Sequence, residues 1–324
     1  MTTKDKILGK LISNNGKPVS GEKLASELSV SRAAVWKHIK ALRIEGYMID
    51  SSTNRGYSLA GAPDLLIPSE IKTGLKTGII GKGIHYFRET ESTNNMAREI
   101  AHSVEEGTVV IAESQSGGRG RIGRKWLSPE GGIWLSIILK PKIQPLHAAR
   151  ITLTAGLAVA RTIQGFGLEA GIKWPNDILI KGKKVCGILT EMEAELDRID
   201  YCVVGIGIDA NVDTELFPGE IRETSTSLKK ELGHTVNRNE FVRRLLEEFE
   251  KEYLKFQGGD FSSILEEWRN LSETIGENVK VTTGSRTIYG EAIGVDNDGA
   301  LILETHDGKL EKIVAGTCEH LRKI

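Results

Sequence analysis

Apolar residues near the start of the chain recur at helical spacing and then give way to two short alternating runs. The apolar positions of residues 7–12, 24–28 and 34–42 predict three helices, the second capped in part by Ser20 and the third by Ser31. Residues 46–50 and 55–59 predict two strands joined by a polar loop. Together with the short turn between the second and third helices, this is the pattern of a winged helix-turn-helix.

The middle of the chain mixes strands of the buried type with helices. Residues 107–113, 132–139 and 200–210 are apolar runs of strand length, residues 148–166 predict a long core helix, and residues 178–180 with 185–189 predict a hairpin. From residue 84 a strand, a polar turn and a helix follow one another. Gly205-Ile206-Gly207 is not a dinucleotide-binding fingerprint, because no third glycine and no helix follow at the required spacing.

The last third of the chain changes pattern twice. An aromatic stripe along residues 241–256 indicates a helix packed on a core and not a cofactor site, and residues 261–271 predict another helix. From residue 279, short alternating strands separated by Asp/Asn/Gly turns predict a small SH3-like β-barrel. We therefore expect an α+β protein with domains at residues 1–62 (winged helix-turn-helix), 63–274 (central mixed α/β) and 275–324 (SH3-like).

Composition narrows the functional classes only a little. The 324 residues carry a formal net charge of −1, so any nucleic-acid binding must come from a local basic patch. The three cysteines are far apart in sequence and have no metal-ligand spacing, which favours a reducing compartment. Because no apolar segment resembles a signal peptide or a membrane span, we expect a cytoplasmic protein that does not contact a membrane.

One stretch, residues 117–126, alternates glycines with cations and ends on Trp126. Glycine allows backbone amides to approach a ligand closely, and arginine offers paired donors that suit phosphate and carboxylate. The stretch is therefore interpreted as a loop that wraps an anionic small molecule. The alternative is a flexible nucleic-acid-binding segment of the Arg-Gly-Gly type, which the neighbouring apolar strand at residues 132–139 disfavours.

The third predicted helix presents basic and polar side chains on its faces away from the core. Such groups can meet phosphates and base edges in a DNA major groove, and the wing can reach the backbone. The alternative is a solvated face of a protein-docking module. The candidate DNA-binding residues of helix and wing are Ser31, Arg32, Trp36, Lys37, Lys40, Arg43 and Arg55.

Four motifs occur in order along the central region: Ser92-Thr93-Asn94; the Gly118–Trp126 loop; Lys173-Trp174-Pro175-Asn176-Asp177; and Lys184-x-x-Gly187-Ile188-Leu189. Taken alone, the first would be a helix cap. Together, in this order, they resemble a biotin protein ligase. With the winged helix in front, the chain resembles the bifunctional form that also represses transcription, and the likeness covers essentially the whole chain.

The resemblance implies a two-step reaction and a set of partners. Biotin's carboxylate attacks the α-phosphorus of ATP, and the biotinyl group then passes to a lysine of a biotin carboxyl carrier protein. ATP and biotin are implied as substrates with Mg²⁺, and biotinyl-adenylate as the corepressor of a homodimer on operator DNA. The central domain would have the biotin/lipoate ligase fold.

The resemblance also assigns candidate residues to roles. Lys184, Arg119 and Arg121 are implied as catalytic cations. The biotin-binding set is implied to be Ser92, Thr93, Asn94, Gln115, Gly118, Arg119, Gly120, Arg121, Lys184 and Gly187. The nucleotide-binding set is implied to be Arg121, Arg124, Trp126, Lys173, Asn176, Asp177, Asn211 and Arg322, with no certain metal ligand.

One residue departs from the family pattern, and two other functions stay open. Asp209 stands where the family usually has Asn, so a nucleotide contact there is in doubt, although Asn211 could take it over. One alternative function is a ligand-sensing transcription regulator with an inactive ligase fold. The other is a relative of the lipoate ligases.

Overall fold

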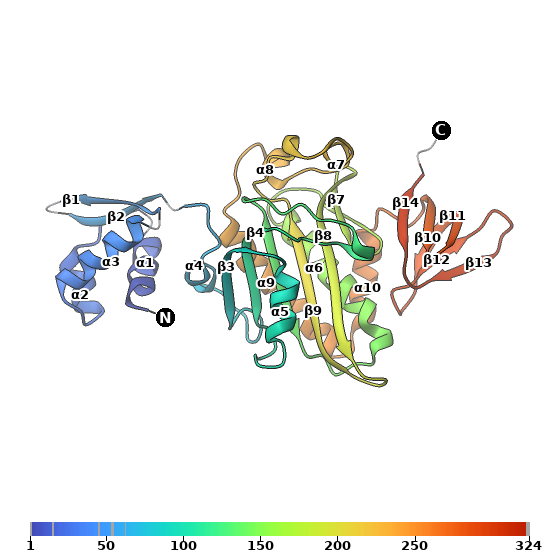
Figure 1. Cartoon of the computed structure of the whole chain (residues 1–324), viewed down its shortest axis with the longest axis horizontal. Helices are drawn as coiled ribbons and strands as arrows, with labels where there is room; N and C mark the ends of the chain where they lie inside the picture. The colour runs from blue at the N-terminus through green and yellow to red at the C-terminus, as the bar shows by residue number, and fades with distance from the viewer. Residues whose placement is uncertain (1, 15, 45, 53–54, 62, 322–324) are drawn as a thin grey trace. The chain divides into compact units, whose positions relative to one another are not determined.

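The computed structural model describes residues 2–14, 16–44, 46–52, 55–61 and 63–321. Contacts between residues divide the chain into two units, Met1–Gly74 and Leu75–Ile324. Arg322, which the resemblance predicts to contact the nucleotide, lies outside the described residues. Figure 1 gives the labels of the helices and strands used below.

The first unit is the winged helix-turn-helix that the hydrophobic pattern predicts. Helices α1 (Thr3–Ser13), α2 (Gly21–Glu27) and α3 (Arg32–Ile44) pack around a buried core, and β1 (Met48–Ser52) pairs with β2 (Gly56–Gly61) as an antiparallel wing. The Ser20 hydroxyl accepts a hydrogen bond from the Lys23 amide at 3.0 Å, so the predicted cap forms. The short helix α4 (Pro68–Lys72) joins this unit through the Tyr47 hydroxyl, which donates to the Glu70 carboxylate at 2.7 Å.

The second unit is built on a seven-stranded sheet of order β3-β4-β5-β9-β8-β7-β6. Its strands are β3 (Ile84–Thr90), β4 (Val109–Gln115), β5 (Ile133–Leu139), β6 (Gly171–Lys173), β7 (Asp177–Ile180), β8 (Lys183–Ala194) and β9 (Ile199–Ile208). Only the β3–β4 pairing is parallel among the described strands of this sheet. β8 and β9 run side by side for most of their length, and their ends carry much of the site described below.

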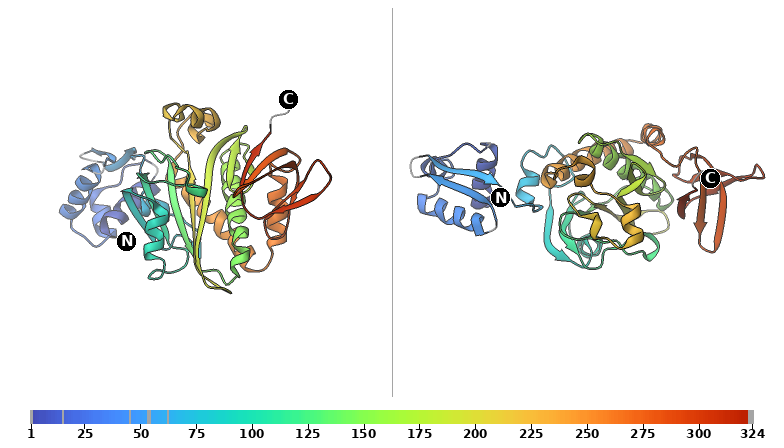
Figure 2. Two further views of the ribbon diagram at one scale, coloured as in Figure 1. Left: turned by 45° about the vertical axis from the view of Figure 1, so that its right-hand side comes forward. Right: turned by 90° about the horizontal axis from the view of Figure 1, so that it is seen from above.

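Helices cover both faces of this sheet. Figures 1 and 2 show α5 (Thr93–Ile100) on one face and α6 (Ala148–Gln164), α9 (Arg238–Gln257) and α10 (Phe261–Asn270) on the other. The predicted aromatic stripe is core packing, because Phe241, Phe249 and Tyr253 of α9 are fully buried. Two short helices, α7 (Gly219–Thr224) and α8 (Leu228–Leu232), lie beyond the end of β9 in the chain.

Five antiparallel strands end the chain as a separate sheet of order β13-β12-β11-β10-β14. They are β10 (Asn278–Thr283), β11 (Arg286–Val295), β12 (Leu301–Glu304), β13 (Leu310–Ile313) and β14 (Thr317–His320). The SH3-like description of these strands stays a prediction. The sheet is tied to the rest of the unit by the Trp174 indole N–H, which donates to the Gly299 carbonyl at 3.0 Å.

Candidate active site

A cavity of about 380 Å³ opens in the second unit and collects residues from all four sequence motifs. Its walls come from the start of α5, the Gly/Arg loop, the ends of β6–β9 and the segment that leads into β14. The predicted site residues that line it are Ser92, Thr93, Asn94, Gln115, Arg119, Gly120, Arg121, Arg124, Trp126, Lys173, Asn176, Asp177, Lys184 and Gly187. Two described candidates, Gly118 and Asn211, are not among the lining residues.

One end of the cavity carries uncharged polar groups. The Gln115 side-chain carbonyl accepts hydrogen bonds from the Thr93 amide at 2.8 Å and from the Thr93 hydroxyl at 3.1 Å. Asn94 is held by the Ser136 hydroxyl at 2.6 Å and donates to the Glu191 carboxylate at 2.7 Å. Ser92 occupies the cap position of α5, but its side chain makes no capping hydrogen bond, so reading this motif alone as a helix cap is wrong.

The floor of the cavity is a patch of sheet without side chains. Tyr201 and Val203 of β9 pack against α5, and alternation along the strand puts Gly205 and Gly207 on that same face. A Cβ atom at Gly205 would lie 2.2 Å from the Asn94 side chain, and one at Gly207 would lie 2.7 Å from the Trp126 indole nitrogen. Only glycine therefore leaves room for α5 and the loop to approach the sheet this closely.

The Gly/Arg loop folds back on itself above this floor. The Trp126 amide donates to the Gly118 carbonyl at 2.9 Å, and the Gly120 amide donates to the Arg124 carbonyl at 2.7 Å. Gly118 has a structural role here, because a Cβ atom would lie 2.5 Å from the Trp126 carbonyl oxygen. The Trp126 ring lies against Trp134 at 6.4 Å between centroids.

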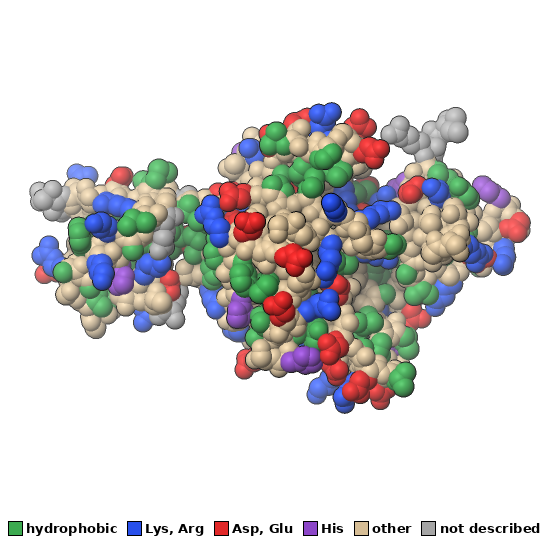
Figure 3. Space-filling model, in the orientation of Figure 1, with side chains coloured by type: hydrophobic (Ala, Val, Ile, Leu, Met, Phe, Trp, Pro, Cys, Tyr) green, Lys and Arg blue, Asp and Glu red, His purple; other side chains and the backbone are tan. Residues whose placement is uncertain are grey.

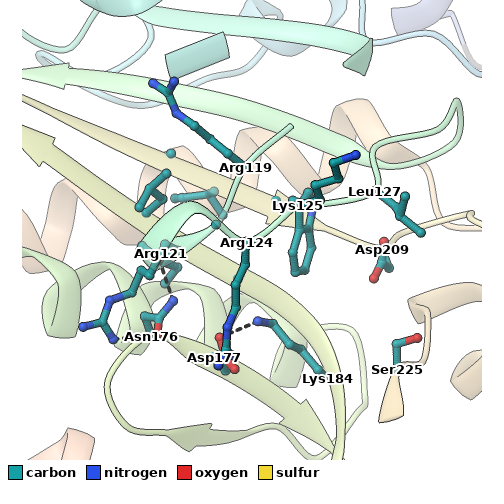
Figure 4. A pocket seen from close by; sticks show the side chains of 18 of the residues that line it. Arg119, Arg121, Arg124, Lys125, Leu127, Asn176, Asp177, Lys184, Asp209 and Ser225 are labelled. Atoms are coloured by element: carbon teal, nitrogen blue, oxygen red, sulfur yellow. Dashed lines mark hydrogen bonds and ion pairs between the residues drawn. The ribbon is translucent and has the colours of Figure 1, made fainter. Parts of the chain in front are cut away.

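Two arginines of the loop reach toward other walls of the cavity. Arg121 donates to the Asn176 side-chain oxygen at 3.3 Å (Figure 4). Arg121 also donates to the Gly316 carbonyl at 3.2 Å, and Arg124 donates to the Thr317 hydroxyl at 3.3 Å. Burial lowers the pKa of the Arg121 guanidinium, and the Asp177 carboxylate partly opposes this shift. The group still remains a cation at any physiological pH.

Arg119 points away from these two arginines (Figure 4). Its guanidinium donates to the Asn95 side-chain oxygen and to both oxygens of Glu191, each of the latter at 3.3 Å. Sequence reasoning missed Glu191, which binds Arg119 and Asn94 at once. Its signal was present in the alternation of β8, because Glu191 lies two and four positions beyond Leu189 and Gly187, both of which line the cavity.

Lys184 is the central cation of the cavity. Its ammonium lies 2.6 Å from the Asp177 carboxylate and 4.9 Å from the centroid of the Trp126 ring (Figure 4). The backbone of Lys184 is also fixed, because its carbonyl accepts a hydrogen bond from the Thr226 amide at 2.9 Å. Lysine, carboxylate and indole thus form one preorganised group.

Asp209 and Asn211 have different surroundings although they are close in sequence. Asp209 lines the cavity with 3% of its surface exposed, and burial raises the pKa of its carboxyl to about 8 against the opposing charge of Lys184. Asn211 instead binds the Val236 backbone through both ends of its amide, at 2.9 Å and 2.8 Å. Its side chain fixes a loop, and Asp209 is the one that faces the cavity.

The exposed surface of the first unit carries most of the candidate DNA-binding residues. Ser31, Arg32, Lys37, Lys40 and Arg55 are exposed, and Trp36 is 56% exposed with the Lys40 ammonium 5.6 Å from its ring centroid. Figure 3 shows several basic side chains on this unit. Arg43 has a different role, because its guanidinium donates to the Ile49 carbonyl and joins α3 to β1.

The fold and the site define an enzyme domain for a ligand with a polar and an anionic end, attached to a DNA-binding domain. Comparisons with known proteins find family matches in the N-terminal, central and C-terminal parts of the chain. Residues 86–209 match the biotin/lipoate A/B protein ligase family, residues 3–58 match an HTH domain, and residues 274–321 match the biotin protein ligase C-terminal domain.

Relatives extend this similarity over nearly the whole chain. The bifunctional ligase/repressor BirA of Bacillus spizizenii is 42% identical over 304 residues, which cover 93% of each protein. The protein of the same name from Escherichia coli is 31% identical and covers 93% of this chain and 92% of its own. The solved structure of Aquifex aeolicus biotin protein ligase in complex with biotin and ATP has a TM-score of 0.65 and 30% identity, covering 75% of this chain and 100% of that one. The chain belongs to the family of bifunctional biotin protein ligases and repressors.

Proposed function

We propose that the cavity joins biotin to ATP and that the chain passes the biotinyl group to a lysine of a biotin carboxyl carrier domain. The family membership supplies the two activities, ATP-dependent biotin ligation and transcriptional repression. The observation that carries the proposal is the polarity of the cavity. A polar end that includes Thr93 and Gln115, where Arg119 is paired with Glu191, is continuous with a cationic end that includes Arg121 and Lys184.

The two ends suit the two reactants. Biotin has an uncharged ureido ring that needs donors and acceptors, which Ser92, Thr93, Asn94 and Gln115 supply. Its carboxylate must approach the α-phosphate of ATP, and repulsion between the two anions opposes this approach. Lys184, Arg121 and Arg124 would lower the barrier by stabilising negative charge that develops on the phosphoryl oxygens.

Asp177 gives Lys184 a defined position before the substrates arrive. The ion pair at 2.6 Å holds the ammonium at the cationic end of the cavity, and the Trp126 ring limits its movement. When a phosphate competes for the ammonium, Lys184 can bridge the reacting carboxylate and the α-phosphate. The oxygen of biotin's carboxylate then bonds to phosphorus while pyrophosphate leaves with the bonding electron pair.

We also propose that Mg²⁺ enters with ATP. Mg²⁺ bound to nucleotides keeps several waters and commonly uses one or two protein carboxylates, so a cluster of protein ligands is not needed. Asp177 is half-buried in the cavity wall and fits one such contact. The ion would neutralise charge on the leaving pyrophosphate.

The second step needs no nucleophile from this chain. The acceptor lysine attacks the carbonyl carbon of biotinyl-adenylate, AMP leaves with the bonding electrons, and the amine loses its proton. The main requirement is to exclude water from a reactive mixed anhydride, which the folded-back loop over the cavity would provide. A cytoplasmic location fits this function, and the three cysteines of the chain are buried and unpaired, as a reducing compartment allows.

Repression is proposed to use the first unit on operator DNA, with biotinyl-adenylate as the corepressor of a homodimer. The exposed Lys37, Lys40 and Trp36 side chains support a DNA-facing role for α3.

No helix among the described residues is long and apolar enough to cross a membrane.

Single-turnover formation of biotinyl-adenylate from labelled ATP and biotin tests the proposal directly. We expect adenylate within one turnover, and transfer of label from biotin to an added carrier domain. The absence of adenylate with folded protein would favour a ligand-sensing regulator without catalysis. Competition between biotin and lipoate in the transfer assay separates the biotin ligase from a lipoate ligase.

A further inference from the structure

Asp209 has a fixed position in the wall of the cavity, where the charge of Lys184 acts on it. It follows the last residue of β9, and its amide donates to the Val185 carbonyl at 2.9 Å while its carbonyl accepts from the Leu228 amide at 2.9 Å. These two bonds fix the backbone on both sides, so the direction of the side chain is set by the sheet. Figure 4 shows the carboxyl group in the cavity wall that faces Ser225.

The carboxyl group has no partner within the part of the chain that the structure describes. It forms no hydrogen bond or ion pair there, and its Oδ1 atom is fully buried. The positive charge of Lys184 lowers the pKa of this carboxyl, but its ammonium is already paired with Asp177. An unpaired carboxylate at 3% exposure is costly, so the group keeps its proton to about pH 8, where the pKa of its carboxyl lies.

The groups around Asp209 do not change this conclusion. From β8, Lys184 favours the ionised form, and the buried Cys186 thiol has its pKa raised further by Asp209. The segment packed against the other side of the backbone brings Ser225, Thr226 and Ser227, which carry no charge. At neutral pH the cavity therefore contains a neutral carboxylic acid, which has one O–H donor.

We propose that Asp209 donates this hydrogen bond to a phosphoryl oxygen of the nucleotide and so controls the affinity of the site for ATP. The inference rests on the proposed function for the presence of ATP in this cavity. A phosphoryl oxygen is the partner that fits, because it accepts a hydrogen bond and is attracted to the neighbouring Lys184. An ionised Asp209 would repel the same oxygen and compete with it for the ammonium.

This role predicts that the affinity for the nucleotide depends on pH, whereas the affinities for biotin and adenosine do not. Only the protonated enzyme would bind the phosphates well, so the dissociation constant should rise about tenfold between pH 7 and pH 9 for a group that ionises near pH 8. Biotin binding should not follow this curve, because biotin occupies the other end of the cavity. Adenosine should not follow it either, because adenosine has no phosphate.

The test is calorimetric titration of the full chain with the Mg²⁺ complex of α,β-methylene-ATP at pH 7, 8 and 9, with biotin and adenosine in parallel. Repeating the titration at pH 9 in buffers of different ionisation enthalpy counts protons. Uptake approaching one proton on nucleotide binding is expected, because the complex keeps the acid form. This measurement needs no variant and remains available if a substitution prevents folding.

Two variants complete the experiment. Asp209→Asn keeps an uncharged donor and should make nucleotide affinity independent of pH in this range. Asp213→Asn changes an exposed acid of the same segment and should keep the tenfold dependence. A dependence that persists in Asp209→Asn, or no proton uptake at pH 9, overturns the inference.

The same data distinguish three further outcomes. A pH dependence for adenosine as well would assign the hydrogen bond to the base or the sugar and overturn the phosphoryl contact. Nucleotide binding that is independent of pH, with normal adenylate formation, refutes this inference and leaves the proposed function intact. No nucleotide binding at any pH refutes the proposed function itself.

Discussion

Lys184 shows how one side chain can be prepared for charge stabilisation. It contacts Asp177 and Trp126, and its backbone is fixed by Thr226. Replacing Lys184 by Ala should reduce single-turnover adenylate synthesis by about two to three orders of magnitude, as expected for the loss of one donor to the transition state. Lys183→Ala, one residue earlier on the same strand, is the control and should remain close to the parent. Activity of Lys184→Ala within twofold of the parent would remove Lys184 from the mechanism.

Glu191 holds two predicted biotin-binding residues, Asn94 and Arg119, in place. Glu191→Gln keeps the shape of the side chain but loses the charge that binds Arg119. We expect the KM for biotin to rise about tenfold with a smaller change in kcat, because a positioning residue acts on binding before chemistry. Glu193→Gln is the matched control, because Glu193 lies on the same strand and contacts His102 and Tyr201 instead. Equal effects of the two substitutions would argue against a positioning role.

The Asp209 carboxyl should also leave a signature in stability. In the unfolded chain it ionises near pH 4, whereas in the folded chain its pKa is about 8, so the folded state binds the extra proton between these values. The free energy of unfolding therefore has no pH dependence from this group below pH 4, and it falls as pH rises from 4 to 8, by up to about 1.4 kcal/mol per pH unit. Asp209→Asn should therefore gain stability relative to the parent at pH 8 more than at pH 5 in urea titrations. An unchanged difference between the two pH values would contradict the raised pKa.

At the scale of single elements, α3 separates two kinds of basic residue. Lys37 and Lys40 are exposed, whereas Arg43 donates to the Ile49 carbonyl and ties the helix to the wing. Replacing both lysines by Ala should weaken operator binding and reduce the slope of log K against log salt by about two, without affecting ligation. Arg43→Ala should instead lower the melting temperature of this unit. A salt slope unchanged by the double substitution would contradict the DNA-facing role of α3.

The elements themselves were largely predictable, because their signals are local. The three N-terminal helices, the wing and the hairpin of β7 and β8 all followed from apolar spacing and turn residues, and the Ser20 cap formed as expected. The interpretation of Ser92 as a helix cap was wrong, because a local pattern cannot show that the Thr93 amide at the start of α5 donates to the Gln115 side chain of β4 instead. The same limit hid Ser136, whose partner Asn94 is distant in sequence. Alternation along β8 could place Glu191 on the cavity face, but it could not identify Asn94 as its partner.

At the scale of the whole molecule, the division into two units predicts that the activities can be separated. Unit Leu75–Ile324 contains every described residue that lines the cavity. The solved Aquifex aeolicus biotin protein ligase is covered over its full length by 75% of this chain. A chain that begins at Leu75 should keep adenylate formation within about threefold and lose operator binding. Loss of adenylate formation by the folded fragment would show that the first unit contributes to catalysis.

The hydrogen bonds from Arg121 to Gly316 and from Arg124 to Thr317 join segments 195 and 193 residues apart. Gly316 and Thr317 lie next to or within β14, and this stretch is the last part of the cavity wall along the sequence. All the other lining residues precede this stretch in the sequence. Folding of the large sheet alone therefore leaves the cavity without this wall, and we expect full binding of the reactants only once the segment before β14 has joined it.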